Sequence, residues 1–178
     1  MKAVLMSIKP KWCELIASGK KTVEVRKNRP KLETPFKVYI YCTIDGGVQG
    51  DMTVPSRLTC GKVIGEFVCY SIYESEWFLS PDHPQWQDRF DDESCLTDRE
   101  LYDYSKGGTF YGWHISDLVI YDKPKELGEF WNADKCPYAS KDGCTYKYHC
   151  FRTGQAKRCG DTLTRPPQSW AYVEEVRR

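Results

Sequence analysis

The fold is decided by the stretch Gly19-Lys20-Lys21-Thr22-Val23-Glu24-Val25-Arg26. Gly19 predicts the end of a helix, because glycine adopts without strain the left-handed backbone conformation that follows a last helical turn. Polar and apolar residues then alternate from Lys21 to Arg26, which predicts a half-buried strand. Side chains of a strand point alternately to its two faces. One face is therefore expected to carry Lys21, Val23 and Val25, and the other Thr22, Glu24 and Arg26.

The preceding sequence predicts a strand over residues 3–8 and then a helix that opens at Lys9-Pro10-Lys11. Proline suits a first helical turn because its missing N–H would have no helical partner there in any case. Trp12, Leu15 and Ile16 recur at the spacing of one helix face, so this helix has an apolar side. The N-terminal part of the chain is thus predicted to be a strand–helix–strand unit.

The rest of the chain predicts further strands and one more short helix. Thr97 can cap that helix, with Glu100 completing a capping box, and the helix is expected to end near Tyr104. A long turn is predicted within 44–60, and an acidic, aromatic loop after residue 72. The expected strands are residues 36–42, 62–72, one or two within 110–121, and 163–176.

Five or six strands with two or more short helices predict an α+β fold built on a small β-barrel. The 178 residues suit one such unit and suffice for a hydrophobic core. We divide the chain into a barrel at 1–128, a cysteine-rich insert at 129–162, and a C-terminal strand at 163–178 that completes the barrel.

The charges are nearly balanced in number, with 26 Lys+Arg against 25 Asp+Glu, but they are unevenly placed. Residues 1–38 hold ten basic and three acidic side chains, a net charge of 10 − 3 = +7. Residues 71–105 hold two basic and ten acidic side chains, a net charge of 2 − 10 = −8. The total excludes a polycationic binder and an acidic disordered tail. The asymmetry fits either a basic face for phosphates or two ordinary solvated surfaces.

The sequence predicts a cytoplasmic protein that makes no membrane contact. The longest apolar run, residues 38–42, is far shorter than the roughly 20 residues of a membrane-spanning helix. The N-terminus reaches Lys9 and Lys11 without the apolar stretch of a signal peptide.

The stretch around Gly19 resembles the ASCH domain, a branch of the PUA-like superfamily, whose hallmark is G-x-K-x-x-E-x-R. All four residues are present here as Gly19, Lys21, Glu24 and Arg26. The segment Ser7-Ile8-Lys9-Pro10 is similar to the family's entry from strand to helix, and the resemblance extends over residues 1–121 with a last strand near 168–176. The resemblance implies a PUA-like barrel with a cleft beside the helix that binds RNA or a modified nucleotide.

Residue chemistry fits binding at this motif. An arginine fork matches a phosphate or a base edge, and a glutamate can orient it or accept from an amino group. We expect the binding residues to be Lys21, Glu24 and Arg26, with Lys9 on a phosphate and Tyr41 among the aromatics able to stack on a base. The alternative from residue chemistry is an exposed same-face ion pair worth less than about 1 kcal/mol. A protein–protein adaptor also remains open.

Some ASCH proteins imply a second possibility, a hydrolase. They remove an acetyl group from cytidine with a lysine, a threonine and a glutamate. Lys21 matches the lysine, but Glu24 occupies the threonine position and Thr22 is a different position. In such a hydrolase, or in a ribonuclease, Lys21 would be the activated group and a carboxylate would be the general acid or base. The motif itself supplies one such carboxylate, Glu24. The glutamate of the family maps onto a region that contains Glu66, Glu74 and Glu76.

Four of the nine cysteines lie close together near the C-terminus, with the spacing C-x7-C-x5-C-x8-C. Four thiolates are a closed ligand set for structural zinc, and a short glycine-rich loop can supply them. The alternatives are a set of reduced thiols, or His149 in place of one cysteine. The predicted zinc ligands are Cys136, Cys144, Cys150 and Cys159.

Overall fold

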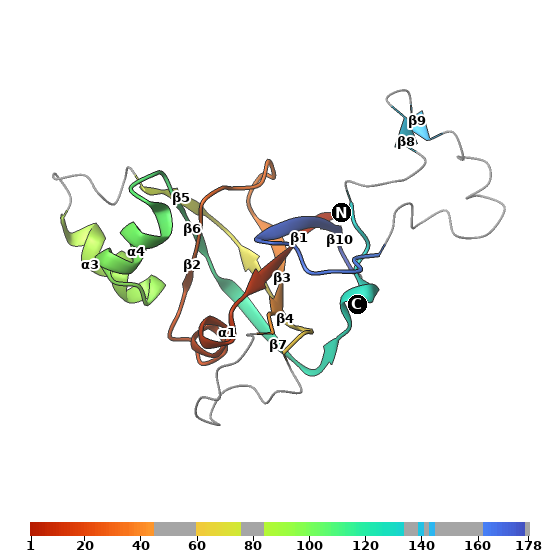
Figure 1. Ribbon diagram of the computed structural model, residues 1–178, viewed down its shortest axis with the longest axis horizontal. Helices are drawn as coiled ribbons and strands as arrows, with labels where there is room; N and C mark the ends of the chain where they lie inside the picture. Colours follow the sequence, from red (N-terminus) through yellow and green to blue (C-terminus); the bar gives the residue numbers. More distant parts are fainter. Residues whose placement is uncertain (45–59, 76–83, 134–138, 141–142, 145–161, 177–178) are drawn as a thin grey trace.

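The computed structural model of the chain describes residues 1–44, 60–75, 84–133, 139–140, 143–144 and 162–176. Strands predominate in the described part, and the helices are short (Figure 1). The elements are β1 (Lys2–Ile8), α1 (Pro10–Ala17), β2 (Val23–Arg26), β3 (Phe36–Cys42), β4 (Val63–Cys69), β5 (Ile72–Glu74), α3 (Pro84–Ser94), α4 (Asp98–Ser105), β6 (Tyr111–His114), β7 (Ser116–Lys125), the 3-10 helix η1 (Leu127–Glu129), β8 (Ala139–Ser140), β9 (Gly143–Cys144) and β10 (Trp170–Glu174). The predicted α+β class and short helices are confirmed.

A five-stranded sheet in the order β10-β1-β3-β4-β7 forms the centre of the fold. β1 and β3 are parallel, and the other neighbours are antiparallel. Alternation along β3 sends Val38 and Ile40 into a core cluster that includes α1 residues, and Tyr39 and Tyr41 into a second cluster on the opposite face. The apolar side of α1 therefore covers one face of this sheet.

A separate three-stranded sheet, in the order β2-β6-β5, carries the motif strand. Only Ile115 lies between β6 and β7, although β6 pairs with β2 and β5 whereas β7 pairs with β4. One nearly continuous stretch of chain thus passes from one sheet to the other (Figure 1). The predicted barrel closure is wrong for the described residues, because their ladder hydrogen bonds form separate sheets of five, three and two strands.

The N-terminal strand–helix–strand unit follows the sequence closely. Pro10 is in the first turn of α1, and Gly19 has φ +73°, the left-handed conformation expected after the last turn. The backbone N–H groups of Lys20 and Lys21 both donate to Leu15 O, at 2.9 and 3.0 Å. These bonds fold the chain back against the helix end and set the position at which β2 begins.

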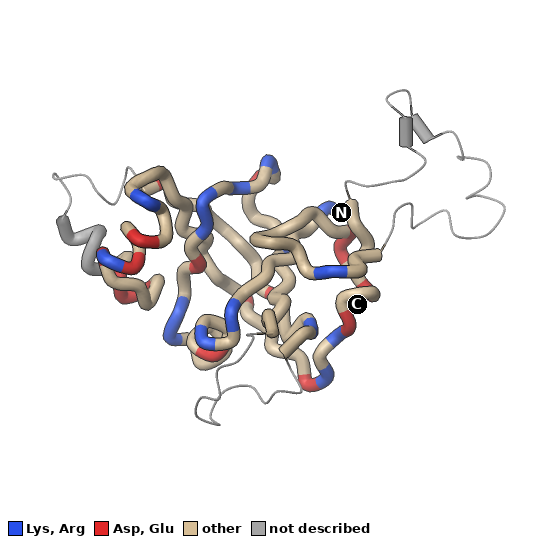
Figure 2. The backbone as a smooth tube through the Cα atoms, viewed as in Figure 1, with Lys and Arg blue, Asp and Glu red and all other residues tan. Residues whose placement is uncertain are grey.

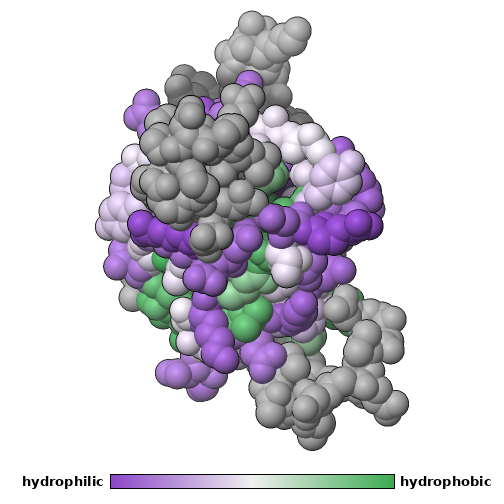
Figure 3. All heavy atoms as spheres, turned by 90° about the vertical axis from the view of Figure 1, so that its left-hand side faces the viewer, coloured by the Kyte–Doolittle hydropathy of each residue, from purple (hydrophilic) through white to green (hydrophobic). Residues whose placement is uncertain are grey.

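The acidic segment contains two helices, not the predicted loop and one helix. Residues 84–94 form α3, and the predicted capping box of Thr97 and Glu100 starts α4. Phe90 and Leu101 of this helix pair pack with Val23 and Val25 of β2. On the side of the molecule that carries these helices, Figure 3 shows hydrophilic residues around a smaller hydrophobic patch, and Asp98, Arg99 and Glu100 of α4 are exposed.

The C-terminal strand β10 pairs with β1 at the edge of the central sheet. Cys136, Cys150 and Cys159 lie outside the described residues, and Cys144 is described only as part of the β8–β9 hairpin backbone. The domain boundaries at 128 and 162 stay predictions. Within the described part of the chain, every helix is too short and too polar to span a bilayer.

Candidate functional site

Strand β2 presents its two faces to different environments. Val23 and Val25 point to the helix pair α3–α4. Glu24 lies directly across from Trp113 of β6, and Arg26 directly across from Tyr111. Because directly opposed residues share a sheet face, these four side chains form one face of the three-stranded sheet.

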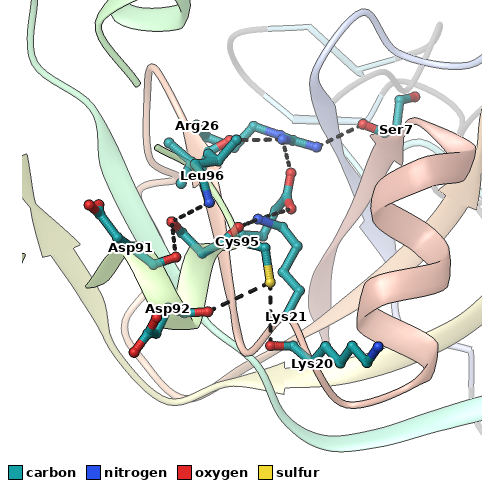
Figure 4. A network of polar contacts seen from close by, with 11 residues as sticks. Ser7, Lys20, Lys21, Arg26, Asp91, Asp92, Cys95 and Leu96 are labelled. Atoms are coloured by element: carbon teal, nitrogen blue, oxygen red, sulfur yellow. Dashed lines mark hydrogen bonds and ion pairs between the residues drawn. The ribbon is translucent and has the colours of Figure 1, made fainter. Parts of the chain in front are cut away.

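The Lys21 side chain is buried, with 2% of its surface exposed. Its ammonium donates to the backbone carbonyl of Ser94 and lies 3.5 Å from Glu24 Oε2 (Figure 4). Lys21 was expected on the Val23 face, but β2 begins only at Val23, so strand alternation does not reach it and its ammonium meets Glu24. Burial lowers the pKa of the Lys21 ammonium, and nearby Glu24 opposes that shift.

Arg26 joins the two sheets through its guanidinium. It ion-pairs with Glu24 and donates to Val25 O at 2.8 Å and to Ser7 O, in β1, at 2.7 Å. Figure 4 shows the contact of this guanidinium with Ser7. Glu24 therefore forms ion pairs with both Lys21 and Arg26. The three side chains together carry a net charge of +1 when all are ionised.

Several buried polar atoms on this face have no hydrogen-bond partner among the described residues. They are Arg26 Nε, Trp113 Nε1 and Glu24 Oε2, the last of which lies 3.5 Å from the Lys21 ammonium as an ion pair. A buried donor or acceptor left without a partner costs about 1–3 kcal/mol, so proteins rarely leave several together. The group offers one acceptor and two donors, which is the mixed pattern that a polar ligand can complete.

The chain around the cluster carries exposed positive charge. Figure 2 shows basic segments at α1, at the start of β2 and in the loop that follows β2. The exposed basic residues of this part are Lys9, Lys11, Lys20, Lys27, Arg29 and Lys31. These residues are thus the exposed cations of the basic N-terminal segment, whereas Lys21 and Arg26 of the motif are buried.

Trp12 lies between the exposed and the buried cations. Its ring is partly exposed, with the Lys11 ammonium 4.3 Å and the Lys21 ammonium 5.0 Å from its centroid. Tyr41, the aromatic of the predicted binding set, is buried in the cluster on the other face of the central sheet. The structure thus brings Lys21, Glu24 and Arg26 together, leaves Lys9 exposed before α1, and places Tyr41 across the sheet from α1.

The three candidate glutamates separate clearly. Glu66 lies directly across from Tyr39 and therefore on the face of the central sheet opposite α1. Glu74 lies across from Tyr111, the cross-strand partner of Arg26, and accepts a hydrogen bond from the Tyr111 hydroxyl at 3.4 Å. Glu76 lies outside the described residues. Register thus places Glu74 on the sheet face of the motif.

Sequence reasoning missed the part of the site that α3 supplies. The carbonyl of Ser94, at the end of α3, is the hydrogen-bond acceptor for Lys21. The Cys95 thiol, in the next residue, donates to Lys20 O at 3.5 Å, as Figure 4 shows. No sequence signal near Gly19 indicates these contacts, because a backbone carbonyl 73 positions away carries no residue-type preference.

Comparisons with known proteins agree with this architecture. The fold resembles crystal structures of ASCH from Zymomonas mobilis, with a TM-score of 0.56, 19% identity and coverage of 97% of this chain and 88% of that one. A serine-to-alanine mutant of that protein has a TM-score of 0.57 and 20% identity, with coverage of 97% of this chain and 89% of that one. A tyrosine-to-phenylalanine mutant has a TM-score of 0.57 and 19% identity, with coverage of 98% of this chain and 92% of that one. The sequence matches no curated protein. The chain thus has the fold of these ASCH structures, and its residues 6–79, which include the whole Gly19–Arg26 motif, match the family model of the ASCH domain.

Proposed function

We propose that the chain binds RNA or a modified nucleotide at the Lys21–Glu24–Arg26 cluster. The observation that carries the proposal is the set of buried polar atoms without a hydrogen-bond partner among the described residues, Glu24 Oε2, Arg26 Nε and Trp113 Nε1. A base edge presents donors and acceptors side by side, as cytosine does with its amino group and ring acceptors. A base edge that reaches this sheet face can therefore complete the hydrogen bonds that the described residues do not make.

The exposed cations supply the second part of the proposal. Lys9 lies directly before α1, and Lys20 lies at the turn into β2, so both flank the buried cluster along the chain. Lysine and arginine side chains that neutralise phosphates release counterions, which makes binding weaken as salt rises. We assign Lys9 and the neighbouring surface cations to the phosphate backbone and the buried cluster to the base.

Trp12 adds a stacking surface at the same place. Its partly exposed ring lies near both an exposed and a buried lysine. Stacking of a base on an aromatic side chain contributes about 1–3 kcal/mol per base and tolerates any sequence. Trp12 is therefore better placed for this role than Tyr41, which is 5% exposed.

A titration of fluorescently labelled single-stranded RNA, followed by anisotropy at increasing KCl, tests the proposal. We expect the affinity to fall with salt and the double variant Lys9→Ala/Lys20→Ala to reduce the slope of log K against log salt by about 0.7 for each lysine removed, the value for single strands. Lys123→Ala is the matched control, because Lys123 is an exposed lysine on β7, outside the N-terminal unit. Binding that is absent, or that does not depend on salt, contradicts the proposal.

A second candidate is hydrolysis of acetylated cytidine or RNA. The lowered pKa of Lys21, caused by burial, favours the neutral amine that a nucleophile or a base needs. Glu74, on the same sheet face as Glu24, is the carboxylate that the register favours as the acid or base. Turnover of N-acetylated cytidine to cytidine and acetate that disappears in Lys21→Ala, with an unchanged circular dichroism spectrum, would establish the enzyme.

We also propose a structural zinc ion held by Cys136, Cys144, Cys150 and Cys159, on their spacing alone. A closed set of four thiolates leaves no position for a substrate, so this zinc has no catalytic role. Metal analysis of protein purified without chelator should give about one zinc per chain. A content near zero contradicts the site.

A further inference from the structure

Three cysteines outside the motif meet where β3 ends beside α1. They are Cys13 of α1, Cys42 at the end of β3 and Cys60 shortly before β4. Cys13 and Cys42 belong to one buried cluster, and Cys60 packs against it. The sulfur atoms of Cys42 and Cys60 are 3.7 Å apart, within hydrogen-bond distance for two thiols.

The backbone holds Cys42 and Cys60 side by side. Gly61 N donates to Cys42 O at 2.7 Å, and Cys42 N donates to Lys62 O at 2.9 Å. Gly61 has φ +83°, a conformation that glycine adopts easily, and this allows the tight approach to the end of β3. A disulfide has sulfur atoms about 2.05 Å apart, so rotation of the two side chains has to close only about 1.7 Å.

The three thiols differ in their access to solvent. Cys13 and Cys42 are fully buried, whereas Cys60 is partly exposed. A hydrogen bond with Cys42 and burial both raise the pKa of the Cys13 thiol. Because the thiolate is the reactive form, the raised pKa disfavours reaction at Cys13, and a dissolved oxidant meets the partly exposed Cys60 first.

We propose that Cys42 and Cys60 form a redox-active dithiol that a hydroperoxide converts into an intramolecular disulfide. The Cys60 thiol loses its proton, its thiolate attacks one oxygen of hydrogen peroxide, the O–O bond breaks, and Cys60 becomes a sulfenic acid while the departing hydroxide takes up that proton as water. The Cys42 sulfur then attacks the Cys60 sulfur, the S–O bond breaks, and a second water leaves. The two thiols lose two electrons and two protons, and hydrogen peroxide is reduced to two water molecules.

The disulfide has a defined structural consequence. It links the two ends of the segment between Cys42 and Cys60, and so joins the end of β3 covalently to the residues just before β4. A cross-link within the chain restricts the unfolded state, so the oxidised protein should melt at a higher temperature than the reduced protein. A dithiol reductant should break the disulfide and return the melting temperature to that of the reduced protein.

Peptide mapping of the full chain tests the pairing. The protein is treated with hydrogen peroxide, its remaining thiols are alkylated, and it is digested with trypsin. Trypsin cuts after lysine and arginine, which puts Cys13, Cys42 and Cys60 in the separate peptides 12–20, 38–57 and 58–62. We expect peptide 58–62 joined to peptide 38–57, with a mass two hydrogens below the sum of the two, and loss of this species on reduction.

Two variants sharpen the test. Cys60→Ser should remove the joined peptide and leave Cys42 alkylated after peroxide treatment. Cys95→Ser is the matched control, because Cys95 is also partly exposed but lies after α3, and it should leave the joined peptide unchanged. Three outcomes overturn the proposal: Cys60 joined to another cysteine, a link between Cys13 and Cys42, or oxidation of Cys60 only to the sulfinic or sulfonic acid.

Discussion

The two faces of β2 are almost equally buried but differ in chemistry. Val23 and Val25 are 0% and 4% exposed and pack against the helix pair α3–α4. Glu24 and Arg26 are 3% and 8% exposed, and they pair with each other beside atoms that lack hydrogen-bond partners within the described structure. One strand of four residues thus separates an apolar interface from a buried charged cluster.

This difference separates what builds the fold from what serves function. Full burial of an apolar side chain stabilises a protein by about 1.5–3 kcal/mol, so the valine face contributes to folding. Burial of charges costs free energy that their pairing recovers only in part, and each unpaired polar atom adds to the cost. The charged face therefore has no advantage for stability over a well-packed apolar one, and its presence supports a binding role.

The largest expected effect concerns the apolar face. Phe90→Ala removes the ring of α3 that fills the space beside Val23 and Gly112. The cavity left behind should lower the free energy of unfolding by about 4 kcal/mol, measured by urea denaturation. Tyr102→Ala on α4, where the side chain is exposed, should change it by less than about 0.5 kcal/mol. Similar losses in the two variants would contradict the packing of Phe90 against β2.

Glu24→Gln should have the next largest effect. It removes the only carboxylate of the cluster and leaves Lys21 and Arg26 as uncompensated buried cations. Breaking a buried ion pair in this way should cost about 3 kcal/mol in the same measurement. Glu33→Gln, at an exposed position, serves as the control. A loss below about 0.5 kcal/mol for Glu24→Gln would show that water reaches the cluster and screens its ion pairs.

A smaller effect should appear in the pH dependence of stability. Burial lowers the pKa of Lys21 from its ordinary value of 10.5, so the unfolded chain holds this proton at pH values where the folded chain has lost it. The contribution of this group to stability therefore rises with pH between the lowered pKa and 10.5, by about 1.4 kcal/mol for each pH unit in that window.

The variant Lys21→Met isolates this contribution, because all other titrating groups are shared. The difference in unfolding free energy, wild type minus variant, should increase from about pH 7 to about pH 10. A difference that stays constant or decreases over this range would contradict a lowered pKa for Lys21.

The sequence predicted those parts of the fold that depend on local patterns. A run rich in Val, Ile and Tyr located β3 at Phe36–Cys42, and Pro10 with Gly19 located α1. The sequence did not correctly predict whether the strands close into a barrel. A strand pattern does not specify that β6 pairs with β2 while the adjoining β7 pairs with β4. Helix α3 was missed because the packing of Phe90 with Val23 and Val25 joins residues that are distant in the sequence.

The site shows the same division. The motif residues Lys21, Glu24 and Arg26 were identified from their spacing, and the structure brings them together. Their burial was not predicted, because it depends on Ser94 and Ser7, whose backbone carbonyls come from other elements. Alternation also misassigned the face of Lys21, which precedes the first residue of β2.

A binding role for the charged cluster is tested most sharply by replacing all three of its side chains with apolar ones. The triple variant Lys21→Met/Glu24→Leu/Arg26→Met should be as stable as the wild type or more stable, because apolar replacement of a buried ion cluster is often neutral or stabilising by about 1–4 kcal/mol. The deciding measurement is its affinity for labelled single-stranded RNA. We predict a loss of at least about tenfold, or about 1.4 kcal/mol, in a folded protein. A folded variant with unchanged affinity would contradict a role of the cluster in binding.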